Sequence, residues 1–93
     1  MKKRLKPLLL WGTCEHIARN VYHAEIDEIE FYTHARTLEA LEKSVFDDFA
    51  KKYDAQGFYV YMSPVRFVVI VPARNKSLPQ IAASMPDWLI AEK

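Results

Sequence analysis

FYVYMSPVRFVVIVP, residues 58–72, predicts two neighbouring β-strands and decides the fold. The first strand alternates, with Tyr59 and Tyr61 on one side and apolar residues on the other, as a strand with two different faces requires. Pro64 interrupts the run, because proline fixes the φ of a turn and donates no ladder hydrogen bond. Residues 66–71 are then apolar after the first position, which is typical of a central strand covered on both faces.

A helix precedes these strands and is predicted by a strong periodic pattern. Its apolar positions fall on one helical face and are Leu38, Leu41, Val45, Phe49 and Tyr53. Thr37 is placed to cap the beginning, and Gly57 stands where a residue with positive φ often follows a helix. Acidic residues also precede basic ones by four positions on the opposite face. This helix leads directly into the strand of residues 58–62.

Two strands and a second helix are predicted nearer the beginning of the chain. Residues 8–11 form a short apolar run that fits a strand ending at a glycine. Apolar residues recur at helical spacing behind Thr13, so residues 14–23 are predicted to form a helix. The alternation of residues 21–26 leaves a strand open as the alternative. Residues 28–34 alternate clearly and predict a half-buried strand.

Short helices are expected near the end of the chain, and a basic arm at its start. Ser77 followed by Gln80 has the spacing of a capping box, so residues 77–91 are predicted to hold short helices interrupted by Pro86. Residues 1–6 are basic and are predicted to form a flexible, solvated arm. The whole chain, residues 1–93, is then one α+β domain: a two-layer sandwich with about four strands in the order strand-helix-strand-helix-strand-strand, two helices on one face, and short C-terminal helices.

Composition and charge favour an ordinary soluble protein. The chain is 51% hydrophobic and 27% charged, and its net charge is +1. The charge is uneven, since residues 25–48 carry −6 between flanking segments of +4 and +3. No stretch is long and apolar enough for a membrane span or a secretory signal. With a single cysteine and no disulfide framework, we expect a cytoplasmic protein.

Motifs for cofactors, metals and catalysis are not found in the sequence. The two glycines are far apart, so no phosphate-binding loop can be written. His16 and His23 share one face of the predicted helix but lie about 10 Å apart along its axis, too far to share a metal unaided. We therefore expect no cofactor, no metal and no catalytic residue, and an enzyme is not the favoured class.

Three classes of function remain open. The favoured one is a binding or regulatory module that contacts a protein partner or a second copy, and the residues predicted for this contact are Tyr32, Tyr59, Tyr61, Glu28 and Glu30. A nucleic-acid binder is the alternative, for which the predicted residues are Lys2, Lys3, Arg4 and Arg66, with tyrosines as stacking surfaces. A thiol-dependent carrier is the third, because Cys14 would stand at the beginning of the predicted helix, where the dipole favours a thiolate.

The alternation of the strands predicts which residues lie on the far face of the sheet, opposite the main helix. If the main helix packs on the side of Phe58 and Phe31, the other side presents three tyrosines and one set of side chains from the last strand. These residues are Tyr59, Tyr61, Tyr32, Val68 and Ile70, with Arg66 at the rim. Such a face is too apolar to leave uncovered in water. Its expected cover is the C-terminal segment, through Leu78, Ile81, Met85, Trp88 and Leu89, with a second chain as the alternative. Whatever stays uncovered is the predicted recognition surface.

Overall fold

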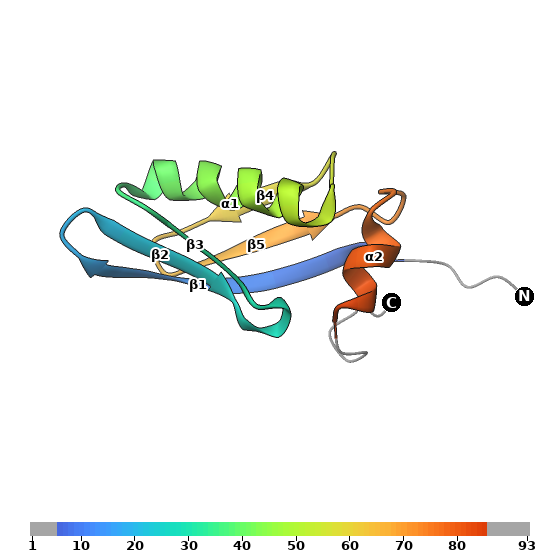
Figure 1. The fold of residues 1–93 in the computed structure, drawn as a ribbon, viewed down its shortest axis with the longest axis horizontal. Coiled ribbons are helices and arrows are strands. Elements are labelled where there is room, and N and C mark those ends of the chain that lie inside the picture. The colour runs from blue at the N-terminus through green and yellow to red at the C-terminus, as the bar shows by residue number, and fades with distance from the viewer. Residues whose placement is uncertain (1–5, 86–93) are drawn as a thin grey trace, which may run out of the picture.

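The chain forms a five-stranded antiparallel sheet with one long helix packed against it (Figure 1). The computed structural model describes residues 6–85. Its strands are β1 (Leu8–Ala18), β2 (Val21–Ile26), β3 (Phe31–Ala35), β4 (Tyr59–Met62) and β5 (Arg66–Val71), and its helices are α1 (Leu38–Tyr53), α2 (Leu78–Ala83) and the short 3-10 turn η1 (Asp27–Ile29). The α+β class is confirmed, whereas the strand number and order differ from the expectation.

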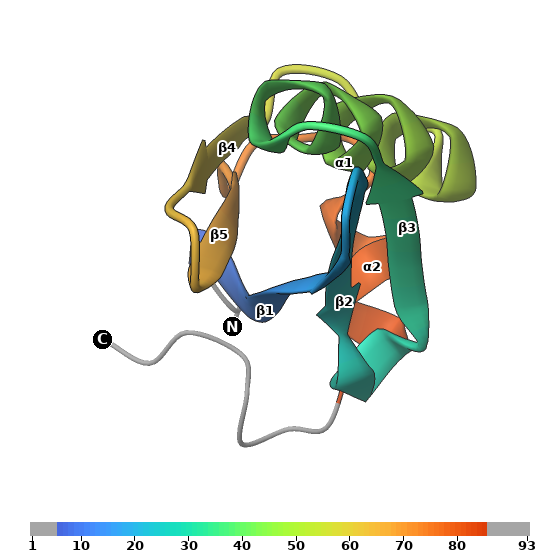
Figure 2. The same ribbon diagram turned by 90° about the vertical axis from the view of Figure 1, so that its left-hand side faces the viewer.

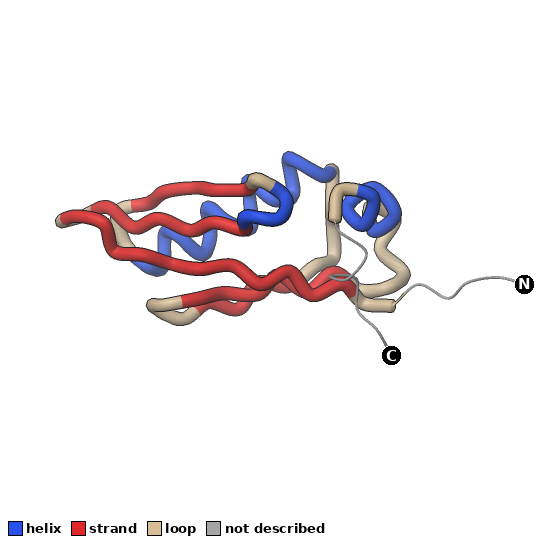
Figure 3. The backbone as a smooth tube through the Cα atoms, turned by 90° about the horizontal axis from the view of Figure 1, so that it is seen from below, coloured by secondary structure: helices blue, strands red, loops and turns tan. Residues whose placement is uncertain are grey.

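The strand β1 is the centre of the sheet, whose order is β3-β2-β1-β5-β4. Its first half pairs with β5, from Leu8 opposite Val71 to Thr13 opposite Arg66. Its second half pairs with β2, from Thr13 opposite Glu25 onward. Figure 3 shows this long strand extending along most of the sheet. The meander β1-β2-β3 therefore lies on one side of the centre and the β4-β5 hairpin on the other.

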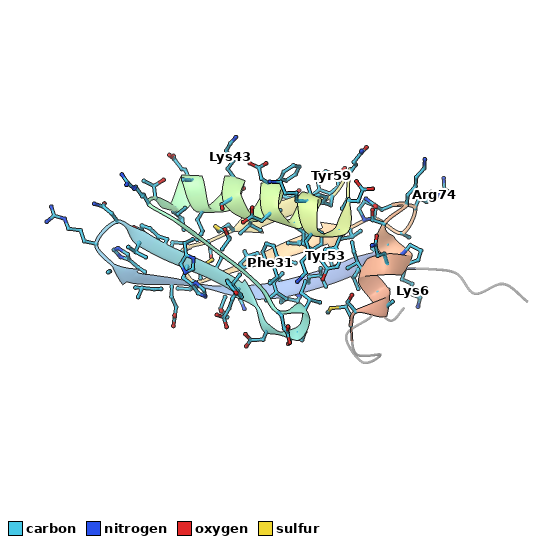
Figure 4. The ribbon with its side chains drawn as sticks, in the orientation of Figure 1. Lys6, Phe31, Lys43, Tyr53, Tyr59 and Arg74 are labelled. Atoms are coloured by element: carbon cyan, nitrogen blue, oxygen red, sulfur yellow. The ribbon has the colours of Figure 1, made fainter. Side chains whose placement is uncertain are left out.

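The sheet curves, and α1 lies between its two edge strands, β3 and β4 (Figure 2). Aromatic side chains fill the space that the sheet and the helix enclose: the ring of Phe49 contacts Phe31 edge-on at 6.0 Å and Phe58 at 5.0 Å between centroids. Phe31 and Tyr53 point into this core, whereas Lys43 points away from it (Figure 4). The expected packing of α1 on the side of Phe58 and Phe31 is confirmed.

Short polar contacts cap the beginning of α1 and hold the helix against neighbouring residues. The Thr37 hydroxyl accepts a hydrogen bond from the amide of Ala40 at 3.0 Å, which confirms the predicted cap. On β3, the buried Thr33 hydroxyl donates to Asp48 Oδ2 at 2.7 Å. Near the end of α1, Lys52 Nζ donates to the carbonyl oxygen of Ile29 at 2.8 Å. These contacts set the position of the helix along β3.

The helix predicted for residues 14–23 is wrong. These residues complete β1, turn through Arg19-Asn20 and begin β2, so the alternative strand at residues 21–26 is correct. Asn20 occupies the left-handed region with φ 60°, a conformation that asparagine tolerates in tight turns. The apolar spacing that suggested a helix does not match the burial, since Ile17 is exposed while Cys14 is buried, and antiparallel pairing with β2 makes these residues a strand.

Three local details also differ from the prediction. The strand expected at residues 28–34 begins only at Phe31, because η1 and the left-handed Glu30, with φ 52°, come first. The residue with positive φ that ends α1 is Asp54, not Gly57, although Gly57 also has φ 70° in the following loop. Ser77 makes no capping bond to α2, since its hydroxyl donates to the carbonyl oxygen of Asp54 at 2.6 Å.

The helix α2 does not cover the far face of the sheet, contrary to expectation. Its side chains Leu78 and Ile81, and Met85 after it, are buried in the same core as α1. The hydrogen bond from Ser77 to the α1–β4 loop holds α2 at the end of the sheet where β1 begins (Figures 1 and 3). The apolar face of α2 is therefore buried inside, and the described part of the C-terminal segment leaves the outer face free. Trp88 and Leu89 lie outside the described residues.

Candidate functional site

An apolar patch lies on the outer face of the sheet, opposite α1, and is built by three neighbouring strands. The strand register places two rows of side chains across β1, β5 and β4. One row is Leu9, Ile70 and Tyr59, and the other is Trp11, Val68 and Tyr61. We call these six residues the outer patch. Their alternation with the buried residues of the same strands is what points them away from the core.

The aromatic members of the outer patch are strongly exposed. Trp11 and Tyr59 are each 55% exposed and Tyr61 is 59% exposed, while Val68 between them is only 9% exposed. Val68 is not part of the inner core and lies between Trp11 and Tyr61 in the same row. Arg66 lies at the border of the patch, with its guanidinium 5.7 Å from the centroid of the Trp11 ring. The patch is therefore continuous, apolar and bordered by a cation.

A groove continues from this patch around the edge of the sheet, between β4 and α1. It encloses about 530 Å³ and is lined on the strand side by residues 58–61 and on the helix side by Glu39, Glu42, Lys43, Phe46 and Asp47. The stacked rings of Phe46 and Phe58, with centroids 4.5 Å apart, give it an aromatic surface. Three acidic side chains against one lysine make its helix wall negative. Tyr59 and Tyr61 belong to both the groove and the outer patch.

The predicted contact residues do not all meet. Tyr59 and Tyr61 lie together on β4, but Tyr32 is on β3 at the opposite edge of the sheet. Glu28 and Glu30 lie around η1, beside Lys52, and belong to neither the groove nor the outer patch. Of the predicted nucleic-acid residues, Arg66 lies within the described part of the chain and reaches the outer patch. Lys2, Lys3 and Arg4 lie outside the described residues.

A polar cluster occupies the outer face of β2 and β3. His23 bonds through Nδ1 to His34 Nε2 at 3.0 Å and through Nε2 to Glu25 Oε1 at 2.7 Å. The pKa of Glu25 is lowered mainly by a hydrogen bond with Asp27 and further by the hydrogen bond with His23. Hydrogen bonding with Glu25 and repulsion by its charge raise the pKa of Asp27. The outer face thus has a polar cluster on β2 and β3 and an apolar patch on β1, β5 and β4.

The observed position of Cys14 removes the physical reason for which a reactive thiol was predicted. It lies in β1, not at the beginning of a helix, and it is buried as a free thiol. Burial raises the pKa of the Cys14 thiol, which disfavours the reactive thiolate. Its place in the core cluster fits a small apolar side chain.

No group of three or more histidine, cysteine, aspartate or glutamate side chains within residues 6–85 is arranged to hold a metal ion. In the same part of the chain, no helix has the length and hydrophobicity needed to cross a membrane.

Sequence reasoning missed Trp11, Leu9 and Phe46 as surface residues. The run at residues 8–11 is entirely apolar, so it shows no alternation from which an outer side could be chosen. The structure supplies this choice, because Leu8 and Leu10 are buried while Leu9 and Trp11 are exposed.

Comparisons with protein-family models, with curated proteins and with solved structures gave no match for this chain.

Proposed function

We propose that this chain is a protein-binding module that recognises a partner through the outer patch. The observation that carries the proposal is the continuous exposure of Trp11, Tyr59 and Tyr61 on one face. Contiguous apolar surface of this kind marks interaction sites, and tryptophan and tyrosine are prominent among the residues that dominate binding energy. The chain has one cysteine and therefore no internal disulfide framework, and we propose a cytoplasmic location on that ground.

The patch alone supports only weak association. Aromatic side chains bury about 150–250 Å² each, so covering the exposed halves of three of them removes roughly 250–400 Å² from water. At about 25 cal/mol per Å², this is worth roughly 6–10 kcal/mol. Association itself costs about 4–15 kcal/mol in lost freedom of motion. A partner that binds firmly must therefore contact the surface beside the patch as well.

The test is photo-crosslinking in the source cell. A photoreactive phenylalanine analogue replaces Tyr61 in one variant and Ile17 in the control; Ile17 is equally exposed, at 57%, but lies at the far end of β1. We expect a discrete product, larger than two copies of the chain, from the Tyr61 position only, and its loss when Trp11→Ser is added. No product, the same product from Ile17, or a product with the mass of two copies would overturn the proposal.

A nucleic-acid binder is the second candidate, and one observation favours it. Arg66 lies over the Trp11 ring, and Tyr61 stands in the same row as Trp11, so a cation and aromatic rings share one face as in single-strand binding surfaces. If this candidate is correct, fluorescence anisotropy of a labelled single strand will show binding that falls steeply with salt. Arg66→Gln would then weaken binding, whereas Arg36→Gln would not. Unchanged anisotropy at low salt with micromolar protein would remove the candidate.

A further inference from the structure

The backbone hydrogen bonds of the β4 edge can be assigned residue by residue. In an antiparallel ladder, hydrogen-bonded pairs alternate with pairs that are not bonded. The amide of Cys14 donates to the carbonyl of Val65 at 3.0 Å, so odd-numbered β5 residues bond to β1. The amide of Ser63 donates to the carbonyl of Arg66 at 2.8 Å, so even-numbered β5 residues bond to β4. The two observations agree.

The same alternation determines which β4 groups face away from the sheet. Tyr59 and Tyr61 pair with even-numbered β5 residues, so their backbone groups are used within the sheet. Val60 and Met62 alternate with them, and their amides and carbonyls point to the other side. Among residues 6–85, β4 pairs with β5 alone and forms one end of the sheet. An extended chain laid along this edge would find donors and acceptors in the correct pattern.

The groove between β4 and α1 runs beside this edge. Edge strands are commonly protected by lysine, proline or a bulge, but β4 has the sequence YVYM and contains none of the protective residues. Phe46, 42% exposed, offers apolar surface to an incoming strand on the side of α1. On the other side, Tyr59 and Tyr61 offer the same. Both sides of an added strand would thus meet aromatic rings.

The negative charge on the α1 side of the groove favours a basic segment as the bound partner. Glu39, Glu42 and Asp47 are exposed on the groove side of α1, and Lys43 is the one base among the lining residues, 3.9 Å from Asp47. Basic side chains on the α1 side of an added strand would place their aliphatic stems on Phe46 and their charges beside the carboxylates. A second copy is disfavoured, because joining two β4 edges would bring two negative helix walls together.

We propose that an extended segment of the partner protein, alternating basic and apolar residues, adds to β4 as a sixth strand. The proposal rests on the protein-binding function argued above and names the form of the segment that is bound. Its basic residues point toward α1 and meet Glu39 and Glu42. Its apolar residues point to the outer side and pack on Tyr59 and Tyr61. Backbone pairing with Val60 and Met62 gives affinity, and the two sets of side chains give specificity.

The test measures the affinity of a fluorescein-labelled, alternating arginine–valine peptide of about eight residues, a common strand length. Two control peptides are used: one with the same residues in two blocks, and one alternating glutamate and valine. We expect the alternating basic peptide to bind the full chain most tightly. The variant Glu39→Lys/Glu42→Lys should lower its affinity at least about tenfold and gain binding of the glutamate peptide, because the charge of the wall is reversed.

A matched charge variant and the crosslinking result complete the design. Glu28→Lys/Glu30→Lys makes the same charge change at residues that do not line the groove, and it should leave the affinity within about twofold because salt screens exposed charges. Equal binding of the block peptide, or an equal loss in both variants, would overturn strand addition. If no peptide binds but Tyr61 still crosslinks a partner, strand addition fails and the protein-binding function stands. If both experiments fail, both proposals fall.

Discussion

Gly12→Ala is expected to destabilise the fold strongly, because the centre of the sheet has no room for a side chain there. Gly12 is buried on the inner face of β1, where this strand passes from β5 to β2. An added Cβ would lie 2.4 Å from Cε1 and Cζ of Phe67 and 2.6 Å from the carbonyl oxygen of Glu25. Carbon atoms are in favourable contact at about 3.5–4.0 Å, so both neighbours must move by about 1 Å. Overpacking costs about 1–3 kcal/mol, and the backbone contact puts this case near 3 kcal/mol.

The assay is urea and thermal unfolding followed by circular dichroism. For a domain of this size, about 3 kcal/mol corresponds to a fall in Tm of roughly 12–24 °C. Gly57→Ala is the matched control: it meets no atom within 4 Å but has φ 70°, so it should cost only about 1–2 kcal/mol through backbone strain. Gly57→Asn should recover most of that loss. A Gly12→Ala variant as stable as Gly57→Ala would refute the reasoning.

Three further predictions concern single side chains. Thr33→Val removes the hydroxyl that donates to the Asp48 carboxylate at 2.7 Å, so it should lower the free energy of unfolding by about 2 kcal/mol in urea. The circular dichroism spectrum of the variant should match that of the original chain. A loss near zero would show that the contact does not stabilise the fold. Hydrogen bonding with Glu25 raises the pKa of Asp27 in the folded state above its ordinary value in the unfolded chain. Protonated Asp27 therefore stabilises the fold fully at pH below the ordinary pKa, and this stability is lost as pH rises through the raised, folded-state pKa. Asp27→Asn should remove that part of the pH dependence of the urea midpoint, and an unaltered profile would contradict it. Because burial raises the pKa of the Cys14 thiol, iodoacetamide should alkylate it at least about tenfold more slowly than the unfolded chain, and equal rates would be evidence against burial.

The helix α1 could be predicted because the information that defines it is local. The cap at Thr37 and the apolar face through Leu41, Val45 and Phe49 depend on residues within a few turns of one another. The β4-β5 hairpin was equally accessible, since alternation, a proline turn and an apolar run follow one another in sequence. Both elements lie close to their predicted positions.

The first half of the sheet could not be predicted with the same success, because the apolar spacing of residues 14–21 is helical while their actual state is set by strand pairing. Residues 8–13 of β1 pair with β5 more than fifty residues later, which no local pattern reveals, whereas residues 14–18 pair with β2 across the Arg19-Asn20 turn. The turn at Arg19-Asn20 was the available signal, since asparagine tolerates positive φ. Residues 8–11 are apolar throughout, so only the partner strands determine that Trp11 faces outward.

The candidate site was predicted in part. The alternation at residues 58–62 correctly placed Tyr59 and Tyr61 on the face away from α1. Tyr32 shares that face but lies on the opposite edge strand, because strand order cannot be obtained from alternation. The acidic wall of the groove belongs to the exposed side of α1, which the sequence alone cannot distinguish from an ordinary solvated helix face.

The central claim, that an extended segment of a partner adds to β4, is tested most directly by amide hydrogen exchange at single residues of that strand. In the free protein, the amides of Tyr59 and Tyr61 should exchange slowly and those of Val60 and Met62 faster, because only the former pair bonds to β5. On saturation with the alternating arginine–valine peptide, exchange at Val60 and Met62 should slow at least about tenfold, while exchange at Ile17 stays the same. Unchanged exchange at Val60 and Met62 with bound peptide would contradict the claim.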